Sequence, residues 1–393
     1  MNDSFDRDID RAGTFSTKYD GRAAMFGHPD VMPLWVADMD FAAPAAVTEA
    51  LVARAAHPVY GYTLFPDSLY GALMDWLESR HGWKVEREWI ILCPGVVPSL
   101  STSILALSAP GDAVIVQPPV YFPFFSVVKK TGRTLLTSAL QLEEGGYRMD
   151  VADLSRQAAS ARLLLLCSPH NPVGRVWSRP ELEKVLEIAR QHQLIILSDE
   201  IHADLIYPGN RHHILASLMD SPESIITAVA PSKTFNIPGL NLSALIVPHP
   251  QCRSAIRAQL EMMHVGASNP FSVVAFEAAY RGGREWLDTL MEYLATTRQM
   301  VQHYLAENLP EIRLIPSQGT YLLWLDCRAL GMNDDELRQF FIFEAGIGMN
   351  PGISFGAEGG GFMRMNIGTP RHRIRKALES IRSALGQRES RLS

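Results

Sequence analysis

The sequence has 393 residues, of which 47% are hydrophobic and 20% are charged, as in an ordinary globular protein. Its length exceeds what one small core holds, so we expect more than one domain. The net charge of −6 argues against a nucleic-acid partner, and the one basic run, at 371–376, fits the solvated face of a helix. Without an apolar stretch of ~18 residues or a segment like a signal peptide, we expect a cytoplasmic protein with no membrane contact.

Short apolar runs alternate with amphipathic segments through the middle of the chain. The runs lie at 113–116, 163–167, 194–197, 225–229 and 244–247. They lack an alternating pattern, which is typical of strands buried on both faces of a largely parallel sheet. Ser178 and Glu181 form a capping box that predicts a helix between two of these runs, and hence a βαβ unit.

Helical patterns also begin near residue 67 and cover 284–308. Further on we predict a strand at 320–326, a helix at 334–345 and a glycine-rich stretch at 346–361. The fold class is therefore α/β: a large domain whose mostly parallel sheet is covered by helices, plus a smaller α+β domain. We place the N-terminal arm and part of the small domain at 1–45, the large domain at 46–283 and the C-terminal part of the small domain at 284–393.

Polar segments follow the apolar run at 90–92 and three of the predicted strands; they lie at 95–99, 168–174, 198–202 and 230–236. In open α/β sheets, ligands bind beyond the carboxyl ends of the strands. Each segment taken alone also fits an ordinary turn or a helix cap. Together they bring to one edge a glycine turn suited to a phosphate, an amide, a carboxylate and an amine.

These segments resemble the pyridoxal-phosphate enzymes of the aminotransferase class I and II superfamily. Asn171, Asp199 and Lys233 stand in the order that this family uses. Within the family, the chain is similar to the bacterial C–S lyases of the cystathionine β-lyase type. That likeness rests on segments 34–41, 60–63, 350–356 and 361–366, and it extends from about residue 30 to 380.

The resemblance implies that the cofactor is pyridoxal 5'-phosphate and that Lys233 holds it covalently. Asp199 would face the pyridine nitrogen and keep it protonated, and the protonated ring withdraws electrons from the substrate. Tyr121 would stack on the ring, and with Lys233 and Asp199 it forms the predicted catalytic set. Asn171 and His202 match positions beside the phenolic oxygen of the ring.

The remaining implied contacts surround the phosphate. Gly95, Val96, Val97 and Ser232 match the phosphate cradle of the family. Tyr62 matches a tyrosine that reaches the phosphate from the partner subunit. The resemblance therefore implies a homodimer with shared active sites.

The partner is expected to be a small-molecule substrate, an amino acid. Arg364 matches the arginine that binds its α-carboxylate, a bidentate task suited to a guanidinium group. Ala37, through its backbone, and Asn171 would lie beside the same carboxylate. The chain departs from many aminotransferases at Ala230 and Asn241, where these often carry a serine and an arginine on the phosphate. Phosphate binding would then depend more on backbone N–H groups and a helix end.

The reaction implied by this likeness is β-elimination from a cysteine S-conjugate. The leading substrate is L-cystathionine, which would give homocysteine, pyruvate and ammonia. An aminotransferase uses the same residues, and nothing in the sequence separates the two outcomes on physical grounds. A third alternative is a regulatory or interaction protein that binds the cofactor. The presence of Lys233, Asp199 and Arg364 disfavours that alternative as the sole function.

Overall fold

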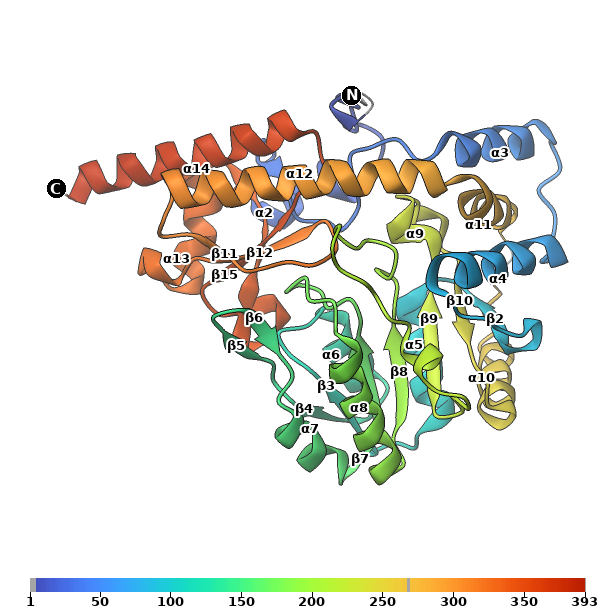
Figure 1. Cartoon of the computed structure of the whole chain (residues 1–393). Coiled ribbons are helices and arrows are strands. Elements are labelled where there is room, and N and C mark those ends of the chain that lie inside the picture. Colours follow the sequence, from blue (N-terminus) through green and yellow to red (C-terminus); the bar gives the residue numbers. More distant parts are fainter. Residues whose placement is uncertain (1–4, 267–268, 393) are drawn as a thin grey trace.

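A computed structural model describes residues 5–266 and 269–392 of the chain. Its centre is a seven-stranded sheet (Figure 1). The strands follow the order β2 (Ile90–Cys93), β10 (Ser243–Ile246), β9 (Ile225–Val229), β8 (Ile195–Asp199), β7 (Ala161–Cys167), β3 (Ala113–Val116) and β4 (Thr134–Thr137). Only β10 is antiparallel to its neighbours in this sheet; the other adjacent pairs are parallel. Six strands therefore present their carboxyl ends at the same edge, which confirms the mostly parallel sheet predicted from the sequence.

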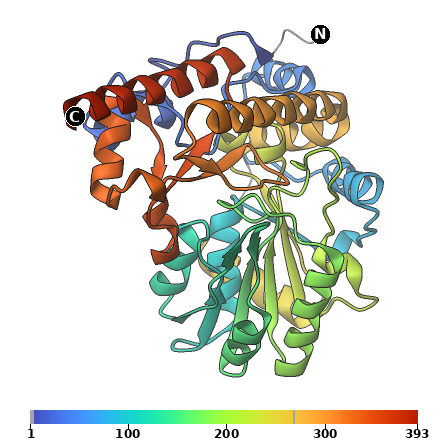
Figure 2. The same cartoon turned by 60° about the vertical axis from the view of Figure 1, so that its left-hand side comes forward.

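Both faces of this sheet are buried under helices (Figure 2). In β7, Leu163 and Leu165 pack on one face, whereas Leu164 and Leu166 pack on the other. The first face is covered by α5 (Val96–Leu107), α6 (Pro123–Lys130) and α10 (Pro250–Met262). The second is covered by α4 (Asp67–His81), α8 (Arg179–His192) and α11 (Pro270–Gly282). Burial on both sides explains why the strands read as unbroken apolar runs.

Helix α8 begins at the capping box that the sequence predicts. The N–H of Ser178 donates to Glu181 Oε2 at 2.8 Å, and the reciprocal half of the box is also present. Leu182, Val185 and Ala189 form the buried stripe against the sheet. Because β7 and β8 are parallel neighbours, the predicted βαβ unit is confirmed.

A second, antiparallel sheet has the order β11 (Arg313–Leu314), β12 (Leu322–Asp326), β15 (Phe362–Asn366) and β14 (Asn350–Pro351). Helix α12 (Arg284–Asn308) has the predicted bounds, and it runs beside α14 (Arg371–Leu392) along one side of the molecule (Figure 1). Helix α13 (Asp334–Gln339) continues as a π-helical turn over Phe340–Glu344, close to the predicted 334–345. Strand β12 begins two residues later than predicted, because Thr320 adopts a φ of 68° that no strand holds.

The N-terminal arm joins the second sheet region, where β1 (Met32–Pro33) pairs in parallel with β13 (Ile347–Gly348). The boundaries 45/46 and 283/284 between domains stay predictions. Within the described ranges, no helix is both long and apolar enough to span a bilayer. The remaining elements are α1 (Thr17–Asp20), α2 (Arg22–Phe26), α3 (Ala45–Ala56), α7 (Val151–Ala158), α9 (Pro231–Thr234), β5 (Gln141–Glu143) and β6 (Gly146–Arg148), with 3-10 turns at Arg87–Trp89, Leu215–Leu218, Pro238–Leu240, Arg328–Leu330, Gly352–Phe355 and Ala357–Gly359.

Candidate active site

A cavity of about 230 Å³ lies at the carboxyl edge of the large sheet. The residues that follow β2, β3, β7, β8 and β9 all contribute to its wall. It is lined by ten of the predicted site residues: Ala37, Gly95, Val96, Val97, Tyr121, Asn171, Asp199, His202, Ser232 and Lys233. Arg364 adjoins the cavity through a hydrogen bond to Asn171. Parallel strands thus bring together side chains that are far apart in the sequence.

Lys233 lies on α9, the single helical turn that follows β9. Its Nζ donates a hydrogen bond to the carbonyl oxygen of Ala37 at 2.6 Å. Burial lowers the pKa of Lys233 to about 8, and the negative charges of Asp38 and Asp199 only partly oppose that effect. A substantial share of the amine is therefore neutral near physiological pH, as a nucleophile or a base requires.

Asp199 is the last residue of β8 and is almost fully buried. Its Oδ1 accepts the backbone N–H of Ile201 at 3.2 Å. Burial raises the pKa of this carboxyl to about 7. No ion pair to Asp199 is recorded in the described part of the chain, so the site offers a buried carboxylate to a cationic group of a ligand.

His202, Tyr121 and Asn171 line the same cavity as Lys233 and Asp199. Burial, together with the positive charges of Lys233 and Arg364, lowers the pKa of His202 to about 3, so its imidazole is neutral. Its Nδ1 is buried and has no recorded partner among the described residues. The N–H of Tyr121 donates to the carbonyl of Asn171 at 3.0 Å, which ties the loop after β3 to the loop after β7.

The N-terminus of α5 forms one end of the cavity. Gly95 has a φ of 103°, a conformation that L side chains rarely adopt. It turns the chain from β2 into α5, so the first-turn N–H groups on Val96 and Val97 have no intrahelical acceptor. These donors and the positive end of the helix dipole favour an anion such as a phosphate. Ser232 and Asn241 line the same cavity.

Arg364 is the middle residue of β15 and is buried. Its Nη1 donates to Asn171 Oδ1 at 3.1 Å, and its Nη2 donates to Asn350 Oδ1 at 2.8 Å and to the Trp35 carbonyl at 2.9 Å. The buried Nε has no recorded acceptor within the described ranges. Burial lowers the pKa of Arg364 to about 10. The guanidinium group stays charged at neutral pH, where it can bind a carboxylate.

Residues 35–41 form a strap beside the cavity, which Ala37 lines, and sequence reasoning missed the side chains that hold this strap. The Ala37 carbonyl accepts the Tyr321 hydroxyl at 2.9 Å in addition to Lys233. Asn366 Nδ2 donates to the carbonyls of Val36 and Asp38. Asn236, three residues after the lysine, binds the strap from the other side through Met39 and Phe41. Asn236 and Asn366 lie in the segments 230–236 and 361–366 that carry the family resemblance, and this was the one sign in the sequence that pointed to them.

Tyr62 does not lie in this cavity. Its side chain is fully exposed, in the irregular segment between α3 and α4. A place for Tyr62 in the site of a partner subunit stays a prediction.

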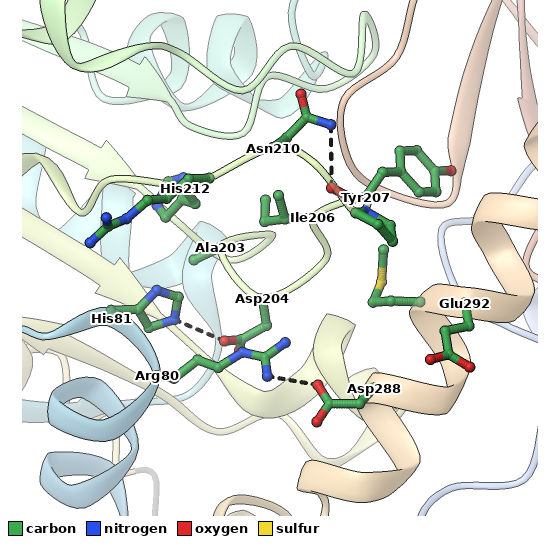
Figure 3. Close-up of a pocket in the computed structure, with 13 residues that line it drawn as sticks. Arg80, His81, Ala203, Asp204, Ile206, Tyr207, Asn210, His212, Asp288 and Glu292 are labelled. Carbon is green, nitrogen blue, oxygen red and sulfur yellow. Dashed lines mark hydrogen bonds and ion pairs between the residues drawn. The ribbon is translucent and has the colours of Figure 1, made fainter.

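A second cavity of about 370 Å³ lies between α4, α12 and residues 203–212 (Figure 3). Sequence reasoning did not find it. There His81 Nε2 lies 2.8 Å from Asp204 Oδ1, and Arg80 pairs with Asp288 at 2.7 Å. Asp204 Oδ2 also accepts the Thr234 hydroxyl at 2.9 Å. Because Thr234 follows Lys233, Asp204 ties the turn that carries the lysine to helix α4.

The residues of the first cavity fit pyridoxal 5'-phosphate. A helix N-terminus is open to the phosphate, a buried carboxylate has no cationic partner among the residues that the structure describes, and a buried lysine has a lowered pKa. An orphaned imidazole nitrogen lies beside them. With the parallel sheet, this set of groups is that of a pyridoxal-phosphate enzyme.

The comparisons agree with this class. The family model "Aminotransferase class I and II" matches residues 29–381, and the chain belongs to this family. Cystathionine beta-lyase PatB of Bacillus subtilis is 42% identical, over 97% of this chain and 100% of its own. Protein MalY of Escherichia coli is 32% identical, over 97% and 98%. The crystal structure of cystalysin from Treponema denticola, which contains pyridoxal 5'-phosphate, has a TM-score of 0.95 and 34% identity and covers 98% of both chains. The predicted fold and family are confirmed.

Proposed function

We propose that the chain is a pyridoxal-phosphate-dependent C–S β-lyase that acts on cysteine S-conjugates, with L-cystathionine as its leading substrate. The observation that carries the proposal is the meeting of Lys233, Asp199 and Arg364 around one cavity. The similarity to PatB, a cystathionine beta-lyase, favours this reaction. The C–S lyase of Staphylococcus hominis, with a TM-score of 0.90 and 31% identity, favours it as well.

The residues then take the following roles. Bound through Lys233, pyridoxal phosphate supplies an electron-withdrawing ring that acidifies the substrate Cα–H bond. Asp199 pairs with the ring nitrogen and keeps it protonated, which also gives the buried carboxylate a cationic partner. Tyr121 covers the ring, and Asn171 and His202 lie at its phenolic oxygen. Gly95, Val96, Val97 and Ser232 hold the phosphate.

The substrate is oriented by its carboxylate and reacts at Cα. Arg364 and Asn171 bind the carboxylate at the end of the strap that includes Trp35. Once the substrate amine has displaced Lys233 from the cofactor, the freed neutral amine of Lys233 takes the Cα proton, and the Ala37 carbonyl aims that amine. The Cβ–S bond breaks and the sulfur leaves as a thiolate. Hydrolysis of the three-carbon product gives pyruvate and ammonia.

Three further proposals concern the assembly of the enzyme, its place in the cell and the limits of its large domain. We infer a homodimer in which Tyr62 reaches the phosphate of the neighbouring subunit; its full exposure in the single chain supports this role. We also propose a cytoplasmic enzyme that supplies homocysteine for methionine biosynthesis. The boundaries at 45/46 and 283/284 are proposed as the limits of the large domain.

Aminotransfer is the weaker alternative. The aspartate aminotransferase of Pyrococcus abyssi is 25% identical, against 42% for PatB. A direct assay separates the two reactions. The protein is incubated with L-cystathionine and pyridoxal phosphate without a keto acid, while pyruvate and free thiol are measured. A β-lyase forms both in equal amounts over many turnovers, and Lys233→Ala forms neither.

An aminotransferase gives a different result in the same assay. Without a keto acid it stops after at most one turnover, and added keto acid restores the reaction without releasing thiol. That outcome would refute the lyase proposal. Reduction with borohydride, followed by peptide mapping, tests the cofactor site independently, and we expect the label on Lys233.

A further inference from the structure

A larger cavity, of about 680 Å³, adjoins the candidate active site. Ala37 and Lys233 line both cavities, so the two cavities adjoin at these residues. Apolar side chains make up much of its wall, and Arg11, Asp38 and Asp40 add charges. The proposed function assigns no role to this space.

The charged part of the wall is an ion-pair cluster on the strap. Arg11 Nη1 and Nη2 bind the two carboxylate oxygens of Asp38 end-on, at 3.0 and 2.7 Å. Nη1 also donates to Asp40 Oδ1 at 2.7 Å and to the Met39 carbonyl at 3.3 Å. Lys18 lies 3.1 Å from the same Asp40 oxygen. Two cations balance two carboxylates, so the cluster as a whole is neutral.

One edge of the Arg11 guanidinium is left unused. A guanidinium group carries five N–H donors in a planar fork. Across the residues that the structure describes, Nη1 donates to Asp38, Met39 and Asp40, and Nη2 donates once, to Asp38. The Nε–H has no acceptor among these residues. The Nε–H and the second N–H of Nη2 point the same way and form a side-on fork that matches a carboxylate. The side chain is 21% exposed, so a ligand in the cavity can reach it.

The order of groups along the strap matches the order of groups in a substrate. At one end, the Trp35 carbonyl contacts Arg364, the proposed partner of the α-carboxylate. In the middle, Ala37 contacts Lys233, which faces Cα. Beyond Ala37, Asp38 and Asp40 hold Arg11. Arg11 and Lys233 line the same larger cavity, so a substituent on the sulfur that extends into this cavity can reach the guanidinium group of Arg11.

We propose that Arg11 binds a carboxylate at the far end of the sulfur substituent, so that the enzyme prefers cysteine S-conjugates whose S-alkyl chain ends in a carboxylate. Cystathionine, with its homocysteinyl group, belongs to this class. This inference rests on the proposed β-lyase function. It adds a substrate class, with Arg11 as the residue that determines specificity.

A pair of substrates of equal length tests the inference. S-(3-carboxypropyl)-L-cysteine and S-butyl-L-cysteine differ only in a terminal carboxylate or methyl group. In the wild-type holoenzyme we expect kcat/KM for pyruvate release to be roughly ten-fold or more higher for the carboxylate, the range of a charge-assisted hydrogen-bond pair. In Arg11→Gln the two values should agree within about three-fold. Arg11→Lys, which keeps the charge without the fork, should give an intermediate ratio.

The ratio of the two kcat/KM values separates a role of Arg11 in binding the terminal carboxylate from a role in supporting the strap. Arg11 also supports the strap, so its variants can slow both substrates, but a purely structural defect leaves the ratio unchanged. Arg328→Gln is the control, because Arg328 also forms a two-bond ion pair with an aspartate, through Nε and Nη2 to Asp326, and does not line either cavity. A wild-type ratio near one, or a preference that survives in Arg11→Gln, overturns the inference. Failure to release pyruvate from either substrate instead overturns the proposed function.

Discussion

Replacing Asp199 by asparagine tests the electrostatics of the site in the cofactor-free protein. The carboxyl is 6% exposed, and burial raises its pKa from 3.8 to about 7. One pKa unit corresponds to about 1.4 kcal/mol of free energy. The ionised carboxylate therefore destabilises the folded protein by about 4 kcal/mol. Asparagine has nearly the same shape, keeps an oxygen for the Ile201 N–H and removes the charge.

The pH dependence has a defined sign. The carboxyl ionises near pH 4 in the unfolded chain but only near pH 7 in the folded protein. Below pH 4 it is protonated in both states and costs nothing. Between pH 4 and 7 the unfolded state holds fewer protons, so the stability of the wild type falls relative to Asp199→Asn. Above pH 7 the difference is constant. Lys233, Glu200 and His202, the nearby titratable groups, are common to both proteins.

Urea unfolding at pH 5 and pH 8 measures this difference. We expect Asp199→Asn to be more stable than the wild type at pH 8, and its advantage to grow by about 3 kcal/mol between the two pH values. Asp67→Asn, whose parent side chain is 96% exposed, serves as the control and should show no such growth. Pyridoxal phosphate should stabilise the wild type more than the variant. An advantage that is absent at pH 8, or that shrinks as pH rises, would refute the reasoning.

Three other predictions concern the carboxylate partner, the dimer and the lysine turn. Arg364→Ala should keep the visible absorbance of the cofactor bound to Lys233 but lose a few hundred-fold in kcat/KM for cystathionine, since removing one partner of a buried charged pair costs ~3–5 kcal/mol; a loss within three-fold would contradict the assignment. Mixing inactive Tyr62→Phe and Lys233→Ala subunits should restore activity through one intact hybrid site, whereas a fully active monomer would exclude sharing. Asp204→Ala should lower the free energy of unfolding in urea by about 3–5 kcal/mol, because it leaves the donors of Trp76, His81 and Thr234 unpaired. Thr234→Ala, which removes one of these bonds, should lower it by about 1 kcal/mol. Equal effects of the two substitutions would show that Asp204 does not hold these three groups together.

The elements predicted well are those whose signals are local. The capping box of α8 and the helical pattern of α12 depend on residues within one or two turns, and both helices begin where predicted. The apolar runs mark strands because each is buried on two faces. Strand direction is not a local property, so the antiparallel β10 and the pairing of β1 with β13, which are more than 300 residues apart, were not foreseen.

The same distinction divides the site. The cofactor-facing residues follow strands, so a parallel sheet brings them together once the strands are recognised. Tyr321, Asn236 and Asn366 hold a strap that lies some 200 to 330 residues earlier in the chain. Their partners are backbone carbonyls, which leave no trace in side-chain pattern. The second cavity, around Asp204, was missed for a similar reason: its donors come from α4 and from the lysine turn.

The strap contacts three groups of the site and so fixes their positions relative to one another. Arg364 binds the carbonyl of Trp35, Lys233 binds that of Ala37, and Asp38 and Asp40 hold Arg11. A displacement of the strap therefore moves the carboxylate partner, the base and the proposed specificity residue together. Since reacting groups must be placed within a fraction of an ångström, losing Asn366, which binds the strap on both sides of Ala37, should lower kcat with every S-conjugate. Losing Arg11 should instead change the choice among them.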